Sequence, residues 1–202
     1  MASHTAKSLF DLNMKGAGQC LVLHDGIVGL NSTLDVSWLL RGVVVFSISA
    51  LDAYFHDKIR YRAGKYGKLE SLPTAMSRFQ IPLGDLRRWQ SATRKGNVLR
   101  NWIVEHYSRR ALQAKDDIAD ALKVVGIVDL WSTVEPDTPT RDQLLKALAE
   151  FVQRRNAIVH EGDRLHARRS GKQLRPIERD YVNRCMLFVY DLVSRIEDAF
   201  PS

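Results

Sequence analysis

An arginine and a histidine lie close together near the end of a helical pattern in segment 144–164, LLKALAEFVQRRNAIVHEGDR. The apolar stripe of this segment passes through Leu148 and Val152 and resumes at Val159. Arg155 lies between them, where the pattern predicts a hydrophobic residue. Because a guanidinium turned toward a core or an interface loses favourable hydration, we expect a carboxylate, a helix end or a bound anion to compensate it.

His160 follows Arg155 on the same helical pattern, about 140° further around the axis and about 7.5 Å further along it. Asn156 and His160 share a face because they are four residues apart. Histidine moves protons near neutral pH, and arginine can hold a phosphate by two parallel hydrogen bonds. RNA carries its own nucleophile, the 2′-hydroxyl, so these two groups suffice for cleavage without a metal. Asn156 would orient the backbone or His160.

The sequence RNAIVH at 155–160 resembles the R-x4-6-H motif of the HEPN superfamily, including the polar residue directly after the arginine. The early ALDAYFHD and the final amphipathic helix are similar to the RiboL-PSP-type branch of that superfamily, and the resemblance covers residues 35–200. It implies a metal-independent endoribonuclease of a bacterial toxin or defence system. Such proteins form homodimers whose two motifs face each other across a cleft, and an antitoxin or defence-system partner is implied as well.

The segment leaves some assignments open. Arg154 is a second candidate for the motif arginine, but helical phase favours Arg155 and turns Arg154 outward. We expect the outward arginines to contact the RNA backbone, namely Arg154, Arg164, Arg168 and Arg169. Asp52 is either the partner of Arg155 or an ordinary carboxylate on a helix surface. Without the resemblance, a buried ion pair at Arg155 and a helix-capping His160 would explain the same residues.

One position departs from the superfamily pattern. Some HEPN toxins carry a tyrosine two residues after the motif histidine, and a partner nucleotidyltransferase modifies it. Gly162 occupies that position in this chain, so we do not expect this mode of silencing.

Periodicity predicts helices at 37–60, 93–107, 112–125 and 140–160, and from 178 onward. The first is the expected central helix, with a core stripe that includes Phe46. Thr140 and Gln143 form a capping-box pattern at the start of the fourth helix, and Gly162 marks its end. The predicted fold is all-α, a helical bundle of four main helices with short extra helices. Residues 1–34 are expected to be an extension packed on or near the bundle, and residues 35–202 the HEPN-like domain.

The charge of the chain is segregated. Residues 58–110 carry 13 Lys and Arg against 3 acidic residues, and residues 154–184 carry 9 against 4, within a total net charge of +7. Clustered cations of this kind favour a polyanion, and RNA or DNA is the natural candidate. Surplus arginine on solvated surfaces is the alternative.

Composition favours a soluble, cytoplasmic protein. Of its 202 residues, 45% are hydrophobic and 26% charged, and its two cysteines lie far apart. The most apolar run, 38–55, is interrupted by Arg41 and Asp52, so we expect no membrane span. The six histidines lack paired-ligand spacing, so neither a metal nor another cofactor is expected.

Two other functions compete with the RNA-cleaving enzyme. One is a non-catalytic HEPN module that binds nucleic acid or a partner protein through the same basic surface. The other is a DNA-associated helical protein. Cleavage of RNA separates the enzyme from both.

Overall fold

The computed structural model describes residues 5–30, 33–66, 72–165 and 173–201. Within these residues the chain is all-α, as predicted from periodicity, and contains no β-strand. A single 3₁₀ turn, Met76–Arg78, is described beside the α-helices. The helices are α1 (Ala6–Gly29), α2 (Ser37–Ala63), α3 (Leu83–Ser91), α4 (Lys95–Tyr107), α5 (Lys115–Val124), α6 (Leu130–Val134), α7 (Thr138–Glu161) and α8 (Arg179–Ala199).

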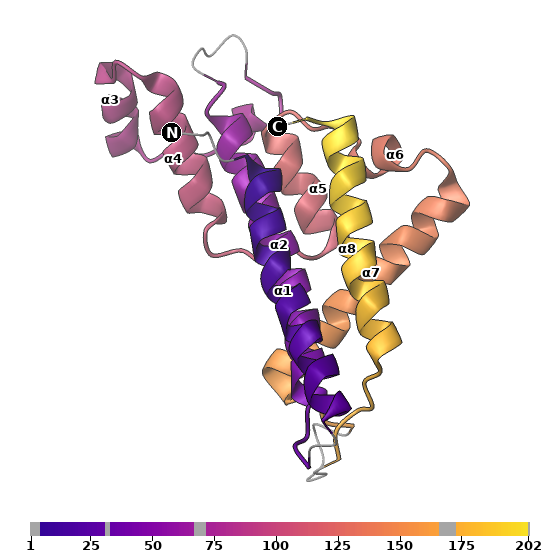
Figure 1. Cartoon of the computed structure of the whole chain (residues 1–202). Coiled ribbons are helices and arrows are strands. Elements are labelled where there is room, and N and C mark those ends of the chain that lie inside the picture. The colour runs from indigo at the N-terminus through magenta and orange to yellow at the C-terminus, as the bar shows by residue number, and fades with distance from the viewer. Residues whose placement is uncertain (1–4, 31–32, 67–71, 166–172, 202) are drawn as a thin grey trace.

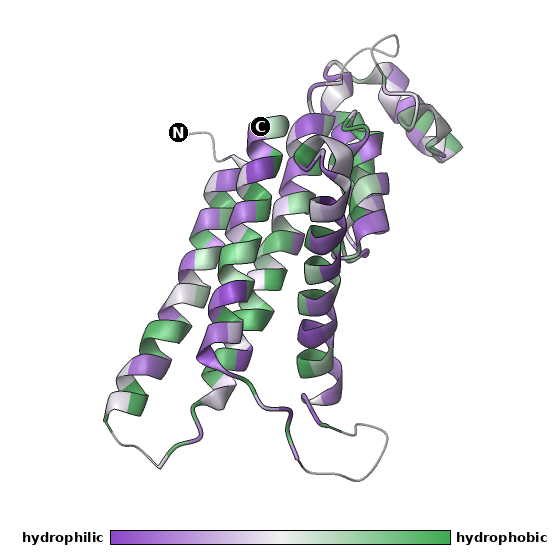
Figure 2. Ribbon diagram, turned by 90° about the vertical axis from the view of Figure 1, so that its right-hand side faces the viewer, coloured by the Kyte–Doolittle hydropathy of each residue, from purple (hydrophilic) through white to green (hydrophobic). Residues whose placement is uncertain are grey.

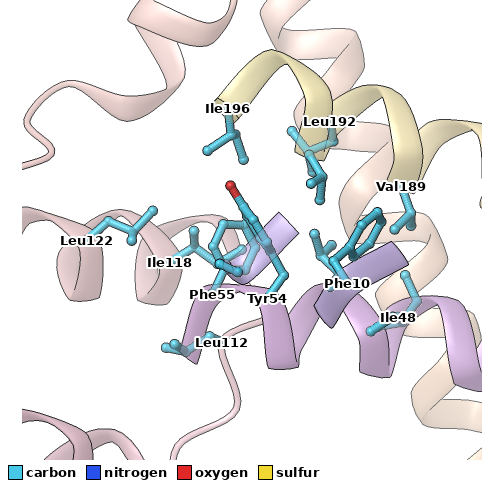
Figure 3. Close-up of a cluster of buried hydrophobic side chains, with 14 of the residues drawn as sticks. Phe10, Ile48, Tyr54, Phe55, Leu112, Ile118, Leu122, Val189, Leu192 and Ile196 are labelled. Carbon is cyan, nitrogen blue, oxygen red and sulfur yellow. The ribbon is translucent and has the colours of Figure 1, made fainter. Parts of the chain in front are cut away.

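Helix α2 is the central element, as the sequence predicted, and packs against α1, α4, α5, α7 and α8 (Figure 1). Helices α1 and α8 run beside it for most of their length, whereas α3 packs on α4. Figure 3 shows part of the core, where Tyr54 and Phe55 of α2 lie close to Phe10 of α1 and Leu192 of α8. Figure 2 shows apolar and polar residues interspersed along the long helices, a pattern typical of helices that bury part of their surface and expose the rest.

Helix α1 shows that the predicted N-terminal extension is a full member of the bundle. It starts with a reciprocal capping box between Thr5 and Ser8. Phe10, Met14 and Ala17 are all fully buried, and the Phe10 ring lies edge-on to Tyr54 at 5.9 Å between centroids. Residues 6–29 therefore contribute to the same core as the rest of the chain.

Helix α2 is buried on more sides than a single stripe predicts. Phe46, expected in the core, is 50% exposed, while Ser47 and Ile48 are fully buried. Among the described helices, α2 alone has the length and mean hydropathy of a membrane span. The most apolar 18 residues of α2 are 56% buried inside the bundle. The core helix of a soluble protein can have the same length and composition. Its buried Lys58 forms an ion pair with Glu197 within the bundle.

Residues next to each end of α7 determine where the helix begins and ends. The prediction that Thr140 and Gln143 cap its start was wrong, because the helix begins two residues earlier. Asp137 is the N-cap, and its carboxylate accepts hydrogen bonds from the Thr140 N–H at 3.0 Å and hydroxyl at 2.6 Å. Gly162 ends the helix at φ 63°, the left-handed conformation predicted from its residue type.

Candidate functional site

The turn that follows α7 is fixed by a buried carboxylate. Asp163, like Gly162 before it, has positive φ (56°), and its N–H donates to the Ala157 carbonyl at 2.9 Å. Its side chain is 0% exposed. One oxygen, Oδ2, accepts from Arg41 Nε at 2.7 Å and from Arg154 Nη2 at 2.9 Å. We call Arg41, Arg154 and Asp163 the Asp163 cluster.

The Asp163 cluster ties three separate segments together. Arg41, 2% exposed on α2, also donates to the Ser37 hydroxyl at 2.8 Å and to the Arg175 carbonyl at 2.6 Å. Arg154 donates to the Pro176 carbonyl at 2.9 Å. The start of α2, the end of α7 and the segment leading into α8 are thus held by charge-assisted hydrogen bonds, which are stronger than neutral ones.

The cluster corrects the prediction that Arg154 points outward toward RNA. The Arg154 side chain is 17% exposed and pairs with the buried Asp163. The prediction placed the inward face along Leu148 and Val152, whereas α7 also buries Phe151, three residues before Arg154. The charge of Arg154 is therefore compensated within the fold.

Arg155 has no such compensation. It is half-buried, and its Nη1 donates to the neutral Asn156 side chain at 3.0 Å. The Nε atoms of both Arg154 and Arg155 are buried without a hydrogen-bond partner, but only Arg155 forms no ion pair with any described residue. Asn156, expected to orient His160 or the backbone, thus contacts Arg155 instead.

Asp52 does not supply the missing charge. Its carboxylate accepts from the Leu112 N–H at 2.5 Å and lies 4.0 Å from His56 Nε2. Of the two roles left open by the sequence, the pairing with Arg155 is not formed. Asp52 is a partly exposed carboxylate on α2 that binds the loop between α4 and α5.

His160 is exposed in the last turn of α7. Within the described part of the chain its imidazole has no hydrogen-bond or ion-pair partner. Val159 beside it is 46% exposed. His160 therefore presents an unengaged proton-transfer group to solvent, one and a half turns beyond Arg155.

Of the other expected RNA-contacting arginines, only Arg164 is described; Arg168 and Arg169 lie outside the described residues. Arg164 is exposed, and its carbonyl accepts from Arg175 Nε at 3.2 Å. No group of three or more His, Cys, Asp or Glu within the described ranges could hold a metal ion.

A cleft between α5 and α7 was not predicted from the sequence. It encloses about 510 Å³, a typical size for a small-molecule site. One wall is the α7 face that carries Ala149, Val152 and Asn156, and the other is the chain entering α5, with Gln113 and Lys115. We call it the α5–α7 cleft. The sequence gives a weak signal for this cleft, because the polar Gln113 stands between the apolar Leu112 and Ala114. In the structure, no side chain caps the start of α5 that follows.

Comparison of the chain with protein-family models, with curated proteins and with solved structures gives no match. The HEPN resemblance stays a prediction from the sequence, based on RNAIVH at 155–160, the early ALDAYFHD and the final amphipathic helix.

Proposed function

We propose that the protein is a metal-independent endoribonuclease of the HEPN type, acting in the cytoplasm as part of a toxin or defence system. One observation carries the proposal: Arg155 is half-buried, lacks an anionic partner among the described residues, and lies on the same helix end as an unengaged His160. Arg154, one residue away, has its charge compensated. A fold that neutralises one arginine and leaves its neighbour unpaired supports binding of an external anion at Arg155.

The chemistry assigned to this pair is transfer within the RNA chain. Arg155 holds the non-bridging oxygens of a phosphodiester and stabilises the charge that develops there. His160 accepts the proton of the 2′-hydroxyl, whose oxygen forms a bond to phosphorus while the bond from phosphorus to the 5′-oxygen breaks. The leaving 5′-oxygen takes a proton from the imidazolium of a second copy. The products are a 2′,3′-cyclic phosphate and a 5′-hydroxyl.

The proposal includes a homodimer that brings two motifs together. Apolar side chains near the motif are exposed in the single chain, including Val159 at 46% and Leu165 at 37%. Burial of such residues favours association, and a facing copy supplies the second histidine. The expected mass in solution, measured by light scattering during gel filtration, is twice that of the chain.

Cleavage of single-stranded RNA in the presence of EDTA tests the proposal. We expect cleavage by the wild type and its loss in His160→Ala and Arg155→Ala, with circular dichroism unchanged. Arg155→Lys keeps the charge but loses the two-pronged phosphate contact, so it should retain only part of the activity. Arg184→Ala, which removes an exposed arginine on α8, is the matched control and should cleave normally.

Two outcomes contradict the proposal. If wild-type protein leaves RNA intact under all conditions in which it is folded and dimeric, it is not this enzyme. Binding of RNA without cleavage would then favour the non-catalytic module. If both motif variants cut like the wild type, the active residues lie elsewhere.

A further inference from the structure

The α5–α7 cleft lies beside the motif but takes no part in the cleavage chemistry described above. Asn156 belongs to both: its side chain lines the cleft and accepts a hydrogen bond from Arg155 Nη1 at 3.0 Å. His160 lies four residues beyond Asn156 and therefore on the same face of α7. The cleft thus runs along the helix toward the proposed scissile phosphate.

The cleft contains a carboxamide that is free to bond to a ligand. Gln113 is 5% exposed, lines the cleft, and makes no hydrogen bond with any described residue. Its amide therefore opens only onto the cleft, where a bound molecule can act as its partner. Gln153 and Asn156 add two further carboxamides from the opposite wall. A ligand with several hydrogen-bonding atoms at its edge would satisfy them.

The charged side chains that line the cleft sum to zero. They are two cations, Lys115 and Arg175, and two anions, Asp116 and Glu161. Arg175 lies 3.7 Å from the Glu161 carboxylate. A phosphate would gain little from such a balanced set, so the lining favours a neutral ligand. The remaining wall is apolar and consists of Leu145, Leu148, Ala149 and Val152. It suits a flat, weakly polar ring.

We propose that the α5–α7 cleft binds an unpaired nucleobase of the RNA, next to the phosphodiester held by Arg155. The ring lies against the apolar wall, and the carboxamides of Gln113, Gln153 and Asn156 bond to its edge. Amide side chains read base edges in this way, and single-stranded RNA exposes those edges. The inference rests on the proposed nuclease function and adds its substrate class, RNA with an unpaired base beside the cleavage point.

Nucleoside binding tests the cleft without any need for catalysis. His160→Ala protein is titrated separately with adenosine, guanosine, cytidine and uridine, and amide resonances are followed by NMR. We expect at least one nucleoside to shift the signals of Gln113 and Ala149. Ala149→Trp fills the cleft from an exposed helix position and should abolish the shifts. Glu150→Trp, the neighbouring exposed position outside the cleft, is the matched control and should bind normally.

Gln113→Leu keeps the side-chain volume and removes the hydrogen bonds. We expect it to weaken the preferred nucleoside about tenfold, the discrimination typical of a good amide-to-base contact. The inference is wrong if none of the four nucleosides shifts the cleft signals, or if Ala149→Trp binds as the wild type does.

Cleavage patterns separate failure of this inference from failure of the proposed function. If the wild type cuts RNA and Gln113→Leu cuts at the same sites and rate, the base-binding role is wrong, but the proposed nuclease function is supported. If no RNA is cut but a nucleoside occupies the cleft, the nuclease proposal fails and the base site is supported.

Discussion

Removing the negative charge of Asp163 should strongly destabilise the protein. Asp163→Asn preserves size, and asparagine tolerates the left-handed backbone at φ 56°. What changes is the partner of two guanidiniums, Arg41 at 2% and Arg154 at 17% side-chain exposure. Breaking one side of a buried ion pair costs about 3–5 kcal/mol. Because both arginines also donate to carbonyls, we expect the lower end, about 3 kcal/mol.

Urea unfolding followed by circular dichroism measures this loss as a lower midpoint with an unchanged slope. Asp191→Asn is the matched control, because Asp191 pairs with Arg195 at the surface with 56% exposure. That exposed pair should contribute less than about 1 kcal/mol. A cost for Asp163→Asn equal to that of the control would refute the view that the buried charge stabilises the turn.

A double-mutant cycle isolates the pairing itself. In an Arg154→Met background only Arg41 still needs the carboxylate, so Asp163→Asn should cost less than it does in the wild type. Equal costs in the two backgrounds would mean that Arg154 and Asp163 do not interact energetically, despite the 2.9 Å contact.

Burial raises the pKa of the Cys185 thiol from 9.0 to about 12, so iodoacetamide at pH 8.5 should modify the partly exposed Cys20 and spare Cys185, as peptide mass spectrometry would show. Since only the unfolded thiol ionises between pH 9 and 12, stability should fall across that window, and less steeply in Cys185→Ala. Gly126→Ala should lower stability by about 1–3 kcal/mol in thermal unfolding, because φ is 80° and a Cβ would lie 2.5 Å from the Tyr66 hydroxyl. Gly18→Ala, with open space in mid-helix, should raise it by about 0.5–1 kcal/mol.

The features predicted best from the sequence are helix bounds and helix ends, because these depend on residues close together along the chain. The helical periods placed α2, α7 and α8 within a few residues of their bounds, and Gly162 marked the left-handed end of α7. Helix α1 was missed because the buried residues Ala6, Phe10, Met14 and Ala17 lie in its first half and several glycines interrupt the pattern. Helix propensity is weak evidence where packing supplies the stability.

The site was predicted only in part, because its decisive contacts are distant in sequence. Arg41 and Asp163 lie 122 positions apart, and no periodicity connects them. Helical phase alone could not show which of Arg154 and Arg155 would pair with the buried carboxylate of Asp163. The position of Asp52 was likewise determined by the Leu112 N–H in the loop before α5.

The long-range anchoring of α7 has a consequence for protein synthesis. Arg41 is made early, but its acceptors Asp163 and the Arg175 carbonyl are translated more than 120 residues later. A growing chain therefore lacks the contacts that hold the motif in place until nearly all of it has left the ribosome. For the nuclease proposed above, this order would keep the motif unassembled while the messenger RNA is being translated.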